Sequence, residues 1–325
     1  MLHLKNQDNG FNLSRLGLGC MRMSMSDGTE NRKESIATIH AALDAGVNFL
    51  NTGDFYDTGH NEMLVGEAIK GYSRDKIFIS VKFGGLIAPN GMPYGIDMRP
   101  LAIKNYLTYS LKRLGVDYVD LYEPCRIDPE IPVEETLEPI AEMVEAGYVK
   151  HIGLSEVDAE TLRRAHAVHP ISLVEVEYSL FDRNIEKELI PTARELGIGI
   201  VAFGVLSHGL LSKERLQEMR NRFPQFHGDN LDKNLSHVDA LREIAEEKQV
   251  TIPQLLTAWV LSQGGDVLPL VGARKVTQLQ ESMKALDVSL SKSDLEKIDD
   301  AVPANTASDS KITIKFKNGM MVYDN

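Results

Sequence analysis

Two strand ends of this 325-residue chain carry side chains that could exchange a proton. The apolar run Val47–Asn51 leads into Thr-Gly-Asp-Phe-Tyr56, and the run Ile77–Val81 ends at Lys82. In parallel α/β proteins, chemistry occurs where the strands end at their carboxyl side. An ammonium beside a phenol stabilises the phenolate, so Tyr56 and Lys82 together would make a proton donor. Taken alone, a solvated strand end and a packing aromatic are the simpler explanation of these two residues.

The elements that would position this pair are short apolar runs that recur about every 30 residues, the size of a βα unit. We expect strands at Leu16–Cys20, Val47–Asn51, Ile77–Lys82, Tyr118–Tyr122, Lys150–Leu154, Ser172–Val176, Ile198–Phe203 and Val267–Val271. Eight such units predict a closed (β/α)₈ TIM barrel. An open doubly wound sheet is the alternative, weakened because Gly17-Leu18-Gly19 lacks the third glycine of a dinucleotide fingerprint.

Helical periodicity fills the gaps between these runs, and the whole chain, 1–325, is expected to form one domain. One apolar face joins Ile36, Ile39, His40 and Leu43, and another joins Ile103, Tyr106, Leu107, Leu111 and Leu114. Asp158 and its neighbours predict a further helix start. The polar segment from Ser207 to about Val250 predicts an insertion, a loop with extra helices over the mouth of the barrel, before the last strand. Residues 1–13 predict a hairpin, and residues 304–325 an extension with a small hairpin at Asn318-Gly319.

The amino-acid composition and net charge limit the kinds of partner that the chain can bind. A hydrophobic content of 43% and a charged content of 25% are those of a globular protein with a substantial core. The net charge of −12 disfavours nucleic acid and anionic membranes as partners. No run is long enough to span a bilayer, and no signal-peptide core precedes the hairpin. Cys20 and Cys125 lie far apart, which favours a reducing compartment, the cytoplasm by default.

The order and spacing of several motifs resemble the aldo-keto reductases over nearly the whole length. The matching segments are SRLGLGCMRM (Ser14–Met23), NTGDFY (Asn51–Tyr56), NEMLVGEA (Asn61–Ala68), ISVK (Ile79–Lys82), LGVDYVDLY (Leu114–Tyr122), KHIGLSE (Lys150–Glu156), EYSL (Glu177–Leu180) and LVGARKV (Leu270–Val276). The resemblance implies a (β/α)₈ barrel that binds NADP(H) across its carboxyl face and reduces carbonyls without a metal. It makes Tyr56 the general acid and Lys82 the residue that lowers its pKa.

The resemblance also exposes two departures. The aspartate that the family pairs with the lysine is Asn51 here, and the histidine that orients the carbonyl is Cys125. Asn51 accepts a hydrogen bond but cannot balance the charge of Lys82, so we expect a less strongly cationic Lys82 unless another acid helps. Asp54, Asp120 and Glu123 are the candidates by sequence. Cys125 reads best as a small space-filling side chain, since a thiolate nucleophile would need a dedicated cationic partner.

The resemblance places the cofactor along the other strand ends. Ser155 and Glu175 would bind the nicotinamide carboxamide, where Glu175 stands at a position that is usually Gln. Phe203 would stack on the nicotinamide ring, and Arg274 would bind the adenosine 2′-phosphate, which favours NADP(H) over NAD(H). The remaining expected contacts, from the first strand end, the pyrophosphate loop and the last βα turn, are Met21, Gly204, Val205, Leu206, Gly209, Gly272, Gln278 and Ser282.

Three functions compete at this stage. The first is reduction of a small carbonyl substrate by NADPH through Tyr56 and Lys82. The second is an NADP(H)-binding protein with weak or lost catalysis, which the exchanges at Asn51 and Cys125 would permit. The third is a lyase that forms a Schiff base on Lys82, which leaves Tyr56 and the Arg274 segment without a role. Metal-dependent hydrolysis is disfavoured because no strand end carries an H-x-H pair. Composition leaves a monomer and a weak homo-oligomer equally open.

Overall fold

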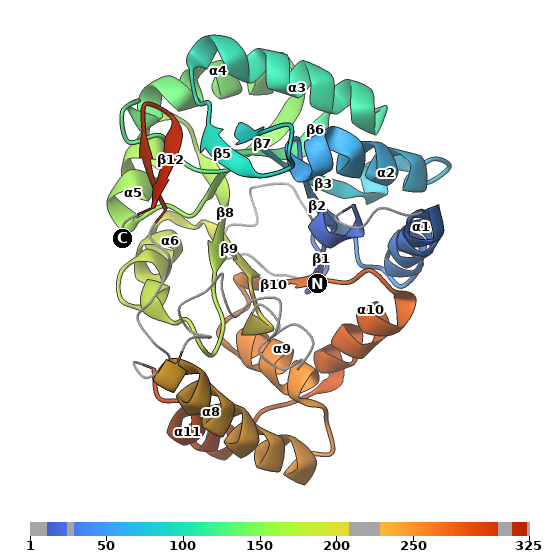
Figure 1. Cartoon of the computed structure of the whole chain (residues 1–325), viewed down its shortest axis with the longest axis vertical. Coiled ribbons are helices and arrows are strands. Elements are labelled where there is room, and N and C mark those ends of the chain that lie inside the picture. The colour runs from blue at the N-terminus through green and yellow to red at the C-terminus, as the bar shows by residue number, and fades with distance from the viewer. Residues whose placement is uncertain (1–11, 25–28, 208–227, 305–313, 324–325) are drawn as a thin grey trace.

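Eight parallel strands close into a barrel in the order β1-β10-β9-β8-β7-β6-β3-β2 (Figure 1). The computed structural model describes residues 12–24, 29–207, 228–304 and 314–323. The strands are β1 (Gly17–Gly19), β2 (Phe49–Gly53), β3 (Phe78–Phe83), β6 (Val119–Pro124), β7 (Val149–Ser155), β8 (Ile171–Glu177), β9 (Gly199–Phe203) and β10 (Val267–Gly272). Each falls on one of the eight predicted runs. The TIM barrel is therefore confirmed, and the open doubly wound sheet is excluded because the sheet closes.

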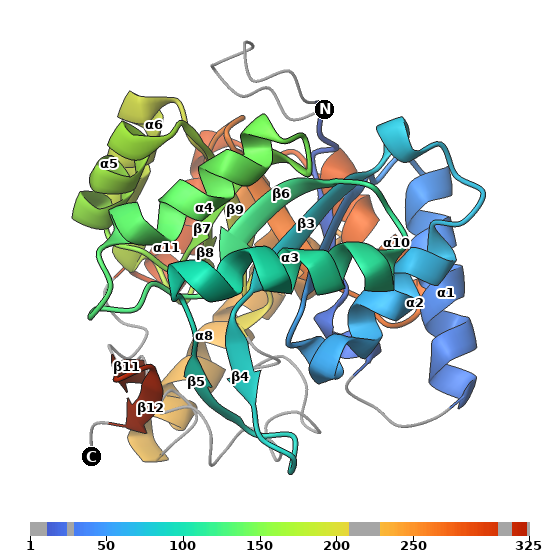
Figure 2. The ribbon, with the colours of Figure 1, turned by 90° about the horizontal axis from the view of Figure 1, so that it is seen from above.

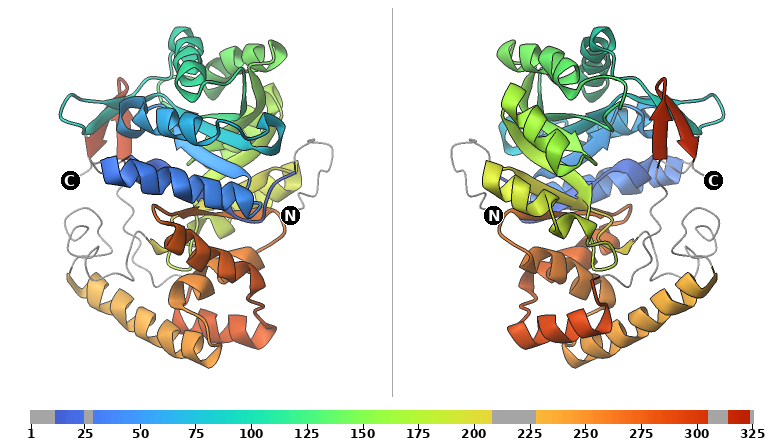
Figure 3. Two further views of the ribbon diagram at one scale, coloured as in Figure 1. Left: turned by 90° about the vertical axis from the view of Figure 1, so that its right-hand side faces the viewer. Right: turned by 90° about the vertical axis from the view of Figure 1, so that its left-hand side faces the viewer.

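Helices surround the barrel on the outside (Figures 1 and 3). They are α1 (Thr29–Asp44), α2 (His60–Ala68), α3 (Pro100–Leu114), α4 (Val133–Glu145), α5 (Ala159–Val168), α6 (Leu189–Leu196), α8 (Gly228–Glu247), α9 (Ile252–Ser262), α10 (Val276–Met283) and α11 (Lys292–Ala301). The predicted apolar stripes face inward, since Ile39 on α1 and Ile103 on α3 are fully buried. Asp158 caps α5 by accepting the backbone N–H of Thr161. The strand before this helix, β7, ends at Ser155.

The interior of the barrel is layered because successive side chains of a strand point to opposite faces. An apolar layer fills the end near the strand starts and comprises Leu13, Phe49, Phe78, Leu121, Leu173, Val201, Leu268 and Leu270. Two residues further along the strands, the inward positions turn polar: Asn51 on β2, Ser80 on β3, Glu123 on β6 and Glu175 on β8 are all buried. The apolar layer therefore closes one end of the barrel beneath a buried polar layer.

A small antiparallel sheet is added outside the barrel, in the order β11-β12-β5-β4 (Figure 2). β4 (Gly85–Ile87) and β5 (Pro93–Ile96) follow β3, while β11 (Ile314–Lys317) and β12 (Met320–Tyr323) form the predicted hairpin near the C-terminus. The two hairpins meet where Gly95 pairs with Met320 and the backbone N–H of Ile96 donates to the Gly319 carbonyl oxygen at 2.7 Å, and a Cβ on Gly95 would collide with that oxygen. The segment Pro89–Asp97 contains β5 and is thus partly strand, although its short, glycine-interrupted pattern does not predict one.

Two predicted extensions fall partly outside the described residues. The N-terminal hairpin at 1–13 is described only from residue 12, and residues 208–227 of the predicted insertion, with Gly209, are likewise outside. The described part of the insertion is α8, which packs beside α11 at the periphery of the barrel (Figures 1 and 3).

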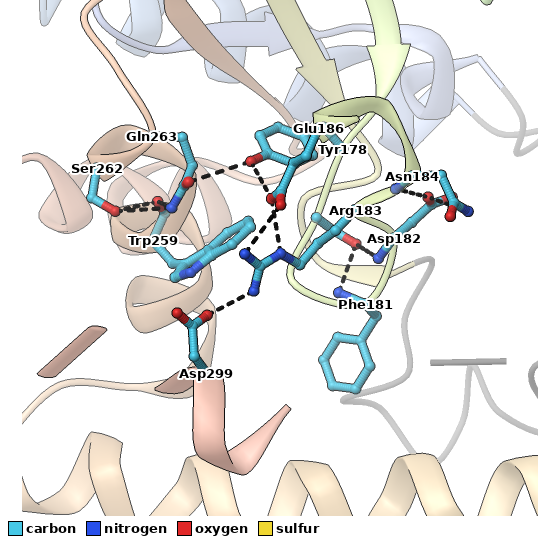
Figure 4. Close-up of polar contacts among 11 residues, drawn as sticks. Tyr178, Phe181, Asp182, Arg183, Asn184, Glu186, Trp259, Ser262, Gln263 and Asp299 are labelled. Atoms are coloured by element: carbon cyan, nitrogen blue, oxygen red, sulfur yellow. Dashed lines mark hydrogen bonds and ion pairs between the residues drawn. The ribbon is translucent and has the colours of Figure 1, made fainter. Parts of the chain in front are cut away.

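The loop that follows β8 is anchored to the last helices by a network centred on one arginine (Figure 4). Arg183 pairs with Glu186 at 2.8 Å and with Asp299 on α11 at 2.6 Å. Its guanidinium lies 5.1 Å from the ring centroid of Trp259 on α9. The Tyr178 hydroxyl completes the network by donating to Glu186 at 2.7 Å. These contacts fix the segment that leaves the carboxyl end of β8.

Candidate active site

A buried ion pair occupies the polar layer of the barrel. Lys82 Nζ donates to Glu175 Oε1 and to Asn51 Oδ1, both at 2.7 Å. Asn51 Nδ2 in turn donates to Glu175 Oε2 at 2.6 Å, so both oxygens of the glutamate accept hydrogen bonds. The side chains of Lys82 and Glu175 are only 6% and 5% exposed. The three residues form a closed triangle in which one ammonium, one carboxylate and one amide satisfy each other.

Glu175 is the acid that the sequence left unidentified. The candidates were Asp54, Asp120 and Glu123, but Asp120 pairs with Arg74 at 2.6 Å, and Asp54 accepts the backbone N–H of Gly84. Because Glu175 is the helping acid, the condition under which Lys82 would be weakly cationic is not met. Burial is the largest single influence and works against the ammonium, but the charges of Glu175, Tyr56 and Glu123 and the hydrogen bond to Glu175 together outweigh it, so the pKa of Lys82 lies above its ordinary value.

Tyr56 lies beside this pair, in the turn that follows β2. Lys82 Nζ is 5.4 Å from the centroid of the Tyr56 ring, and Phe55 packs edge-on against that ring with 4.8 Å between centroids. Asp57 and Thr58 continue the turn in the left-handed region, with φ of +48° and +51°, a conformation that β-branched residues rarely adopt. The turn therefore holds the phenol over the lysine that the next strand supplies.

The phenol keeps its proton in this environment. Burial raises the pKa of Tyr56 to about 12, and the neighbouring Lys82 opposes that rise. We expected Lys82 to lower the pKa of Tyr56, but the net shift is upward. Desolvation of a phenolate outweighs the nearby positive charge. Tyr56 thus starts as a proton donor, and Lys82 stands where it stabilises the phenolate that donation leaves.

A second carboxyl, Glu123, extends the polar layer toward β6. Ser80 Oγ accepts from Asn51 Nδ2 at 3.2 Å and donates to Glu123 Oε1 at 3.0 Å. Glu123 is fully buried, and its Oε2 has no hydrogen-bond partner among the described residues. Gly153 on β7 leaves space for the Glu123 carboxyl, since a Cβ on Gly153 would lie 2.9 Å from Glu123 Oε2.

Cys125 lies at the carboxyl end of β6 with 6% of its surface exposed. Burial raises the pKa of its thiol to about 12, so the side chain is neutral and a poor nucleophile. This supports the small space-filling role and leaves the carbonyl-orienting position without a strong hydrogen-bond donor. The turn that contains Tyr56 also contains the carboxyl of Asp54, and burial raises the pKa of that carboxyl to about 7.

The predicted nicotinamide contacts line the strand ends next to the ion pair. Ser155 ends β7, is 1% exposed, and lies directly opposite Glu175 in the register of β7 and β8. Phe203 ends β9 and is half-buried, opposite Glu177 of β8. The barrel thus brings Ser155, Glu175 and Phe203 to neighbouring strand ends, whereas Met21 lies in the turn after β1 and is 42% exposed.

The segment predicted to bind the pyrophosphate has an unsatisfied hydroxyl. Gly204 adopts a φ of +71°, which glycine tolerates freely, and the following Val205 is buried while Leu206 is half-buried. Ser207 Oγ is buried and has no hydrogen-bond partner within the described part of the chain. An orphaned buried hydroxyl in this loop fits a ligand with acceptor oxygens.

The last strand and the helix after it offer a second phosphate position. A Cβ on Gly272 would meet nothing within 4 Å, and α10 begins at Val276 without a side-chain cap at Lys275. Gln278 Oε1 accepts the backbone N–H of Arg274, so it shapes the turn, while Ser282 is buried further along the helix. No ion pair engages the half-buried Arg274 guanidinium in the residues that the structure describes. These residues fit a phosphate at a helix start.

The outline of the site could be read from strand ends, but the role of Glu175 as partner of Lys82 was missed. The signal was present: an acid is missing at position 51 and an extra acid stands at position 175. Nothing local connects the two, since Lys82 and Glu175 lie 93 residues apart and meet only when the barrel closes.

Among the described residues, no group of histidine, cysteine and carboxylate side chains could hold a metal ion, and no helix has the length and apolar character needed to cross a membrane.

Comparison with known proteins agrees with this geometry. The sequence model of the Aldo/keto reductase family matches residues 15–303. The chain is 41% identical to "Probable aldo-keto reductase 1" of Glycine max over 302 residues, which cover 90% of this chain and 87% of that protein. It superposes on the glycerol dehydrogenase AKR11B4 from Gluconobacter oxydans with a TM-score of 0.84 at 27% identity, covering 96% and 98% of the two chains. An aldo/keto reductase from Klebsiella pneumoniae in complex with NADP and acetate gives a TM-score of 0.71 at 26% identity, covering 90% and 92%.

Proposed function

Because the chain belongs to the aldo/keto reductase family, we propose that it reduces a small aldehyde or ketone to the alcohol with NADPH, reversibly. The observation that carries the proposal is the half-buried Tyr56, whose ring centroid lies 5.4 Å from the Nζ of the buried Lys82. A general acid at this position would protonate the carbonyl oxygen as the carbon accepts a hydride.

The proposed cofactor is NADP(H), which supplies the hydride when bound. Ser155 and Phe203 would hold the nicotinamide, the Gly204–Ser207 loop the pyrophosphate, and Arg274 the 2′-phosphate. Two observations support these assignments: within the described ranges, the Ser207 hydroxyl has no hydrogen-bond partner and the Arg274 guanidinium has no ion pair. Relatives from Klebsiella pneumoniae were solved with NADP and with NADPH. Glu175 engages both oxygens with Lys82 and Asn51, and its remaining lone pairs could still accept from a carboxamide NH₂.

The residues of this chain divide the proton chemistry among them. Tyr56 donates its proton to the substrate oxygen, and the charge of Lys82 stabilises the phenolate that results. Glu175 keeps Lys82 ionised, which Asn51 cannot do alone. Asn51 orients both partners, since it accepts from Lys82 and donates to Glu175. The acid missing at position 51 is in this view moved to position 175 rather than lost.

A binding protein with weak or lost catalysis remains the second candidate, and one observation favours it. Cys125 offers no strong hydrogen bond to a carbonyl, so orientation of the substrate would depend on other groups. The lyase alternative is weaker, because a Schiff base requires a neutral amine and Lys82 is held as an ammonium between two acceptors. Both cysteines are buried and unpaired, which fits the cytoplasm as the compartment.

The test is a titration with NADPH followed by a panel of small aldehydes and ketones. Quenching of the single tryptophan, Trp259, or calorimetry would report binding, and the loss of NADPH would report turnover. Binding with steady NADPH oxidation supports the reductase. Binding without turnover on any carbonyl supports the binding protein, and trapping of a substrate on Lys82 by borohydride would support the lyase.

A further inference from the structure

The polar layer of the barrel contains one more carboxyl than its charges require. Lys82 and Glu175 already balance each other as an ammonium and a carboxylate. Glu123 lies in the same layer with no exposed surface, linked to the pair through Ser80 and Asn51. An ionised Glu123 would leave a net negative charge in a buried interior, which is unfavourable. One of the two glutamates must therefore hold a proton.

The hydrogen bonds identify which glutamate holds it. Both oxygens of Glu175 accept, one from Lys82 and one from Asn51, as expected of a carboxylate. Among the described residues, Glu123 accepts one hydrogen bond, from Ser80 to Oε1, and its Oε2, which lies beside Gly153, has no donor. That oxygen is the place for a proton. Burial, together with the negative charge of Glu175, raises the pKa of Glu123 well above its usual range.

The charged neighbours of Glu123 are few. β3 contributes Lys82, β8 contributes Glu175, and the turn after β2 contributes the neutral phenol of Tyr56. β7 contributes Gly153 at the same level and His151 one layer below, where burial lowers the pKa of the imidazole to about 4 and keeps it neutral. The interior is thus electrically neutral only while Glu123 is protonated. One additional positive charge at the mouth would remove the reason for that proton to stay.

We propose that Glu123 is a buried proton store, which keeps its proton beside the neutral reduced nicotinamide and releases it to solvent when the positively charged oxidised nicotinamide binds. The inference rests on the proposed function, because it needs the nicotinamide to lie beside Ser155 and Glu175. The balance is simple: the Glu123 carboxylic acid becomes a carboxylate, one proton leaves to the buffer, and no other bond changes. The interior and the bound ring together stay neutral in both states.

Calorimetric titration of the full chain with NADP⁺ and with NADPH, in two buffers of different ionisation enthalpy, counts the protons released. The wild-type protein should release about one proton more per site with NADP⁺ than with NADPH. Its affinity for NADP⁺ should rise by up to about tenfold per pH unit near neutrality, while that for NADPH changes less. Effects of the 2′-phosphate are common to both nucleotides and cancel in the comparison.

Two variants identify the source of the proton. Glu123→Gln keeps the size of the side chain and the hydrogen bond from Ser80, and it should abolish the difference in proton release between NADP⁺ and NADPH. Tyr56→Phe removes the other group that could lose a proton, and it should leave the difference intact. Persistence of the difference in Glu123→Gln, or its loss in Tyr56→Phe, would overturn the proposal.

Infrared spectroscopy of wild-type protein labelled with ¹³C at glutamate gives a second measurement that needs no variant. NADP⁺ should remove a protonated-carboxyl band that NADPH leaves in place, and an unchanged band would contradict the inference. Binding of both nucleotides without any difference in proton release would overturn this inference alone. Failure of both nucleotides to bind would overturn the proposed function and the release together.

Discussion

The residue that most changes the interpretation of the site is Glu175. At position 51 an amide stands where the resemblance implies an acid, and at position 175 an acid stands where it implies an amide. Because Lys82 Nζ reaches both side chains at 2.7 Å, the exchange leaves its environment with one carboxylate and one amide. The two departures therefore compensate each other, a conclusion that neither position supports alone.

This compensation predicts the behaviour of single and double variants. Glu175→Gln should remove the carboxylate that Lys82 contacts directly, and breaking a buried pair costs about 3–5 kcal/mol in the free energy of unfolding. Turnover should fall with it, because an ammonium without its partner loses its proton more readily. The double variant Asn51→Asp/Glu175→Gln returns a carboxylate to the triangle and should recover most of both losses. Urea unfolding and the rate of NADPH oxidation measure the two effects.

Asn51→Asp alone is the matched control. It places a second carboxylate against Glu175 Oε2, which Asn51 now contacts at 2.6 Å, so it should be less stable and less active than the double variant. A double variant no better than Glu175→Gln would show that the position of the carboxylate matters, and not merely its presence.

At the scale of elements, the barrel strands and the hairpin of β11 and β12 were predictable, and the pairing of this hairpin with β5 was not. Parallel strands buried on both faces read as apolar runs, so all eight could be recognised along the chain. β4 and β5 are short, contain glycine and proline, and gain their partner from β12, which lies more than 200 residues further along the sequence. Pairing between such distant segments leaves no local pattern, and the same reason hid the contact between Lys82 and Glu175.

Gly153 on β7 provides a test of the packing around Glu123. A Cβ at this position would lie 2.9 Å from Glu123 Oε2 and 3.0 Å from a methyl group of Leu121, so Gly153→Ala should overpack the layer. We expect a loss of about 1–3 kcal/mol in the free energy of unfolding, measured in urea. Gly272→Ala is the control, since its Cβ meets nothing within 4 Å and stability should not change. Equal stability of the two variants would contradict the packing described for Glu123.

For the whole molecule, buried carboxyls with raised pKa values predict how stability depends on pH. The pKa of Asp54 is about 7 in the folded chain and near 4 when unfolded, so between these values the folded state holds more protons. The free energy of unfolding should therefore fall as the pH rises through this window. Asp54→Asn should make that decline shallower, as thermal unfolding between pH 4 and about pH 7 would reveal.

Asp294 is the control for the sign of this effect. Its hydrogen bonds with Lys248 and Ser291 lower the pKa of its carboxyl to about 2. The stability that it contributes is present above its unfolded pKa and is lost as the pH falls toward 2. Asp294→Asn should therefore alter the acid limb only, and the pH 4–7 window should match wild type. A steeper decline in Asp54→Asn would contradict the assignment of Asp54.

The central claim, that Tyr56 supplies the proton in an NADPH-dependent reduction, is tested most directly by one rate. NADPH oxidation with a saturating aldehyde should be at least about 100-fold slower in Tyr56→Phe than in wild type, because the general acid is lost. NADPH affinity should be unchanged, and Tyr109→Phe, at a tyrosine that is 50% exposed on α3, should match wild type. A loss smaller than about tenfold in Tyr56→Phe would mean that another group donates the proton.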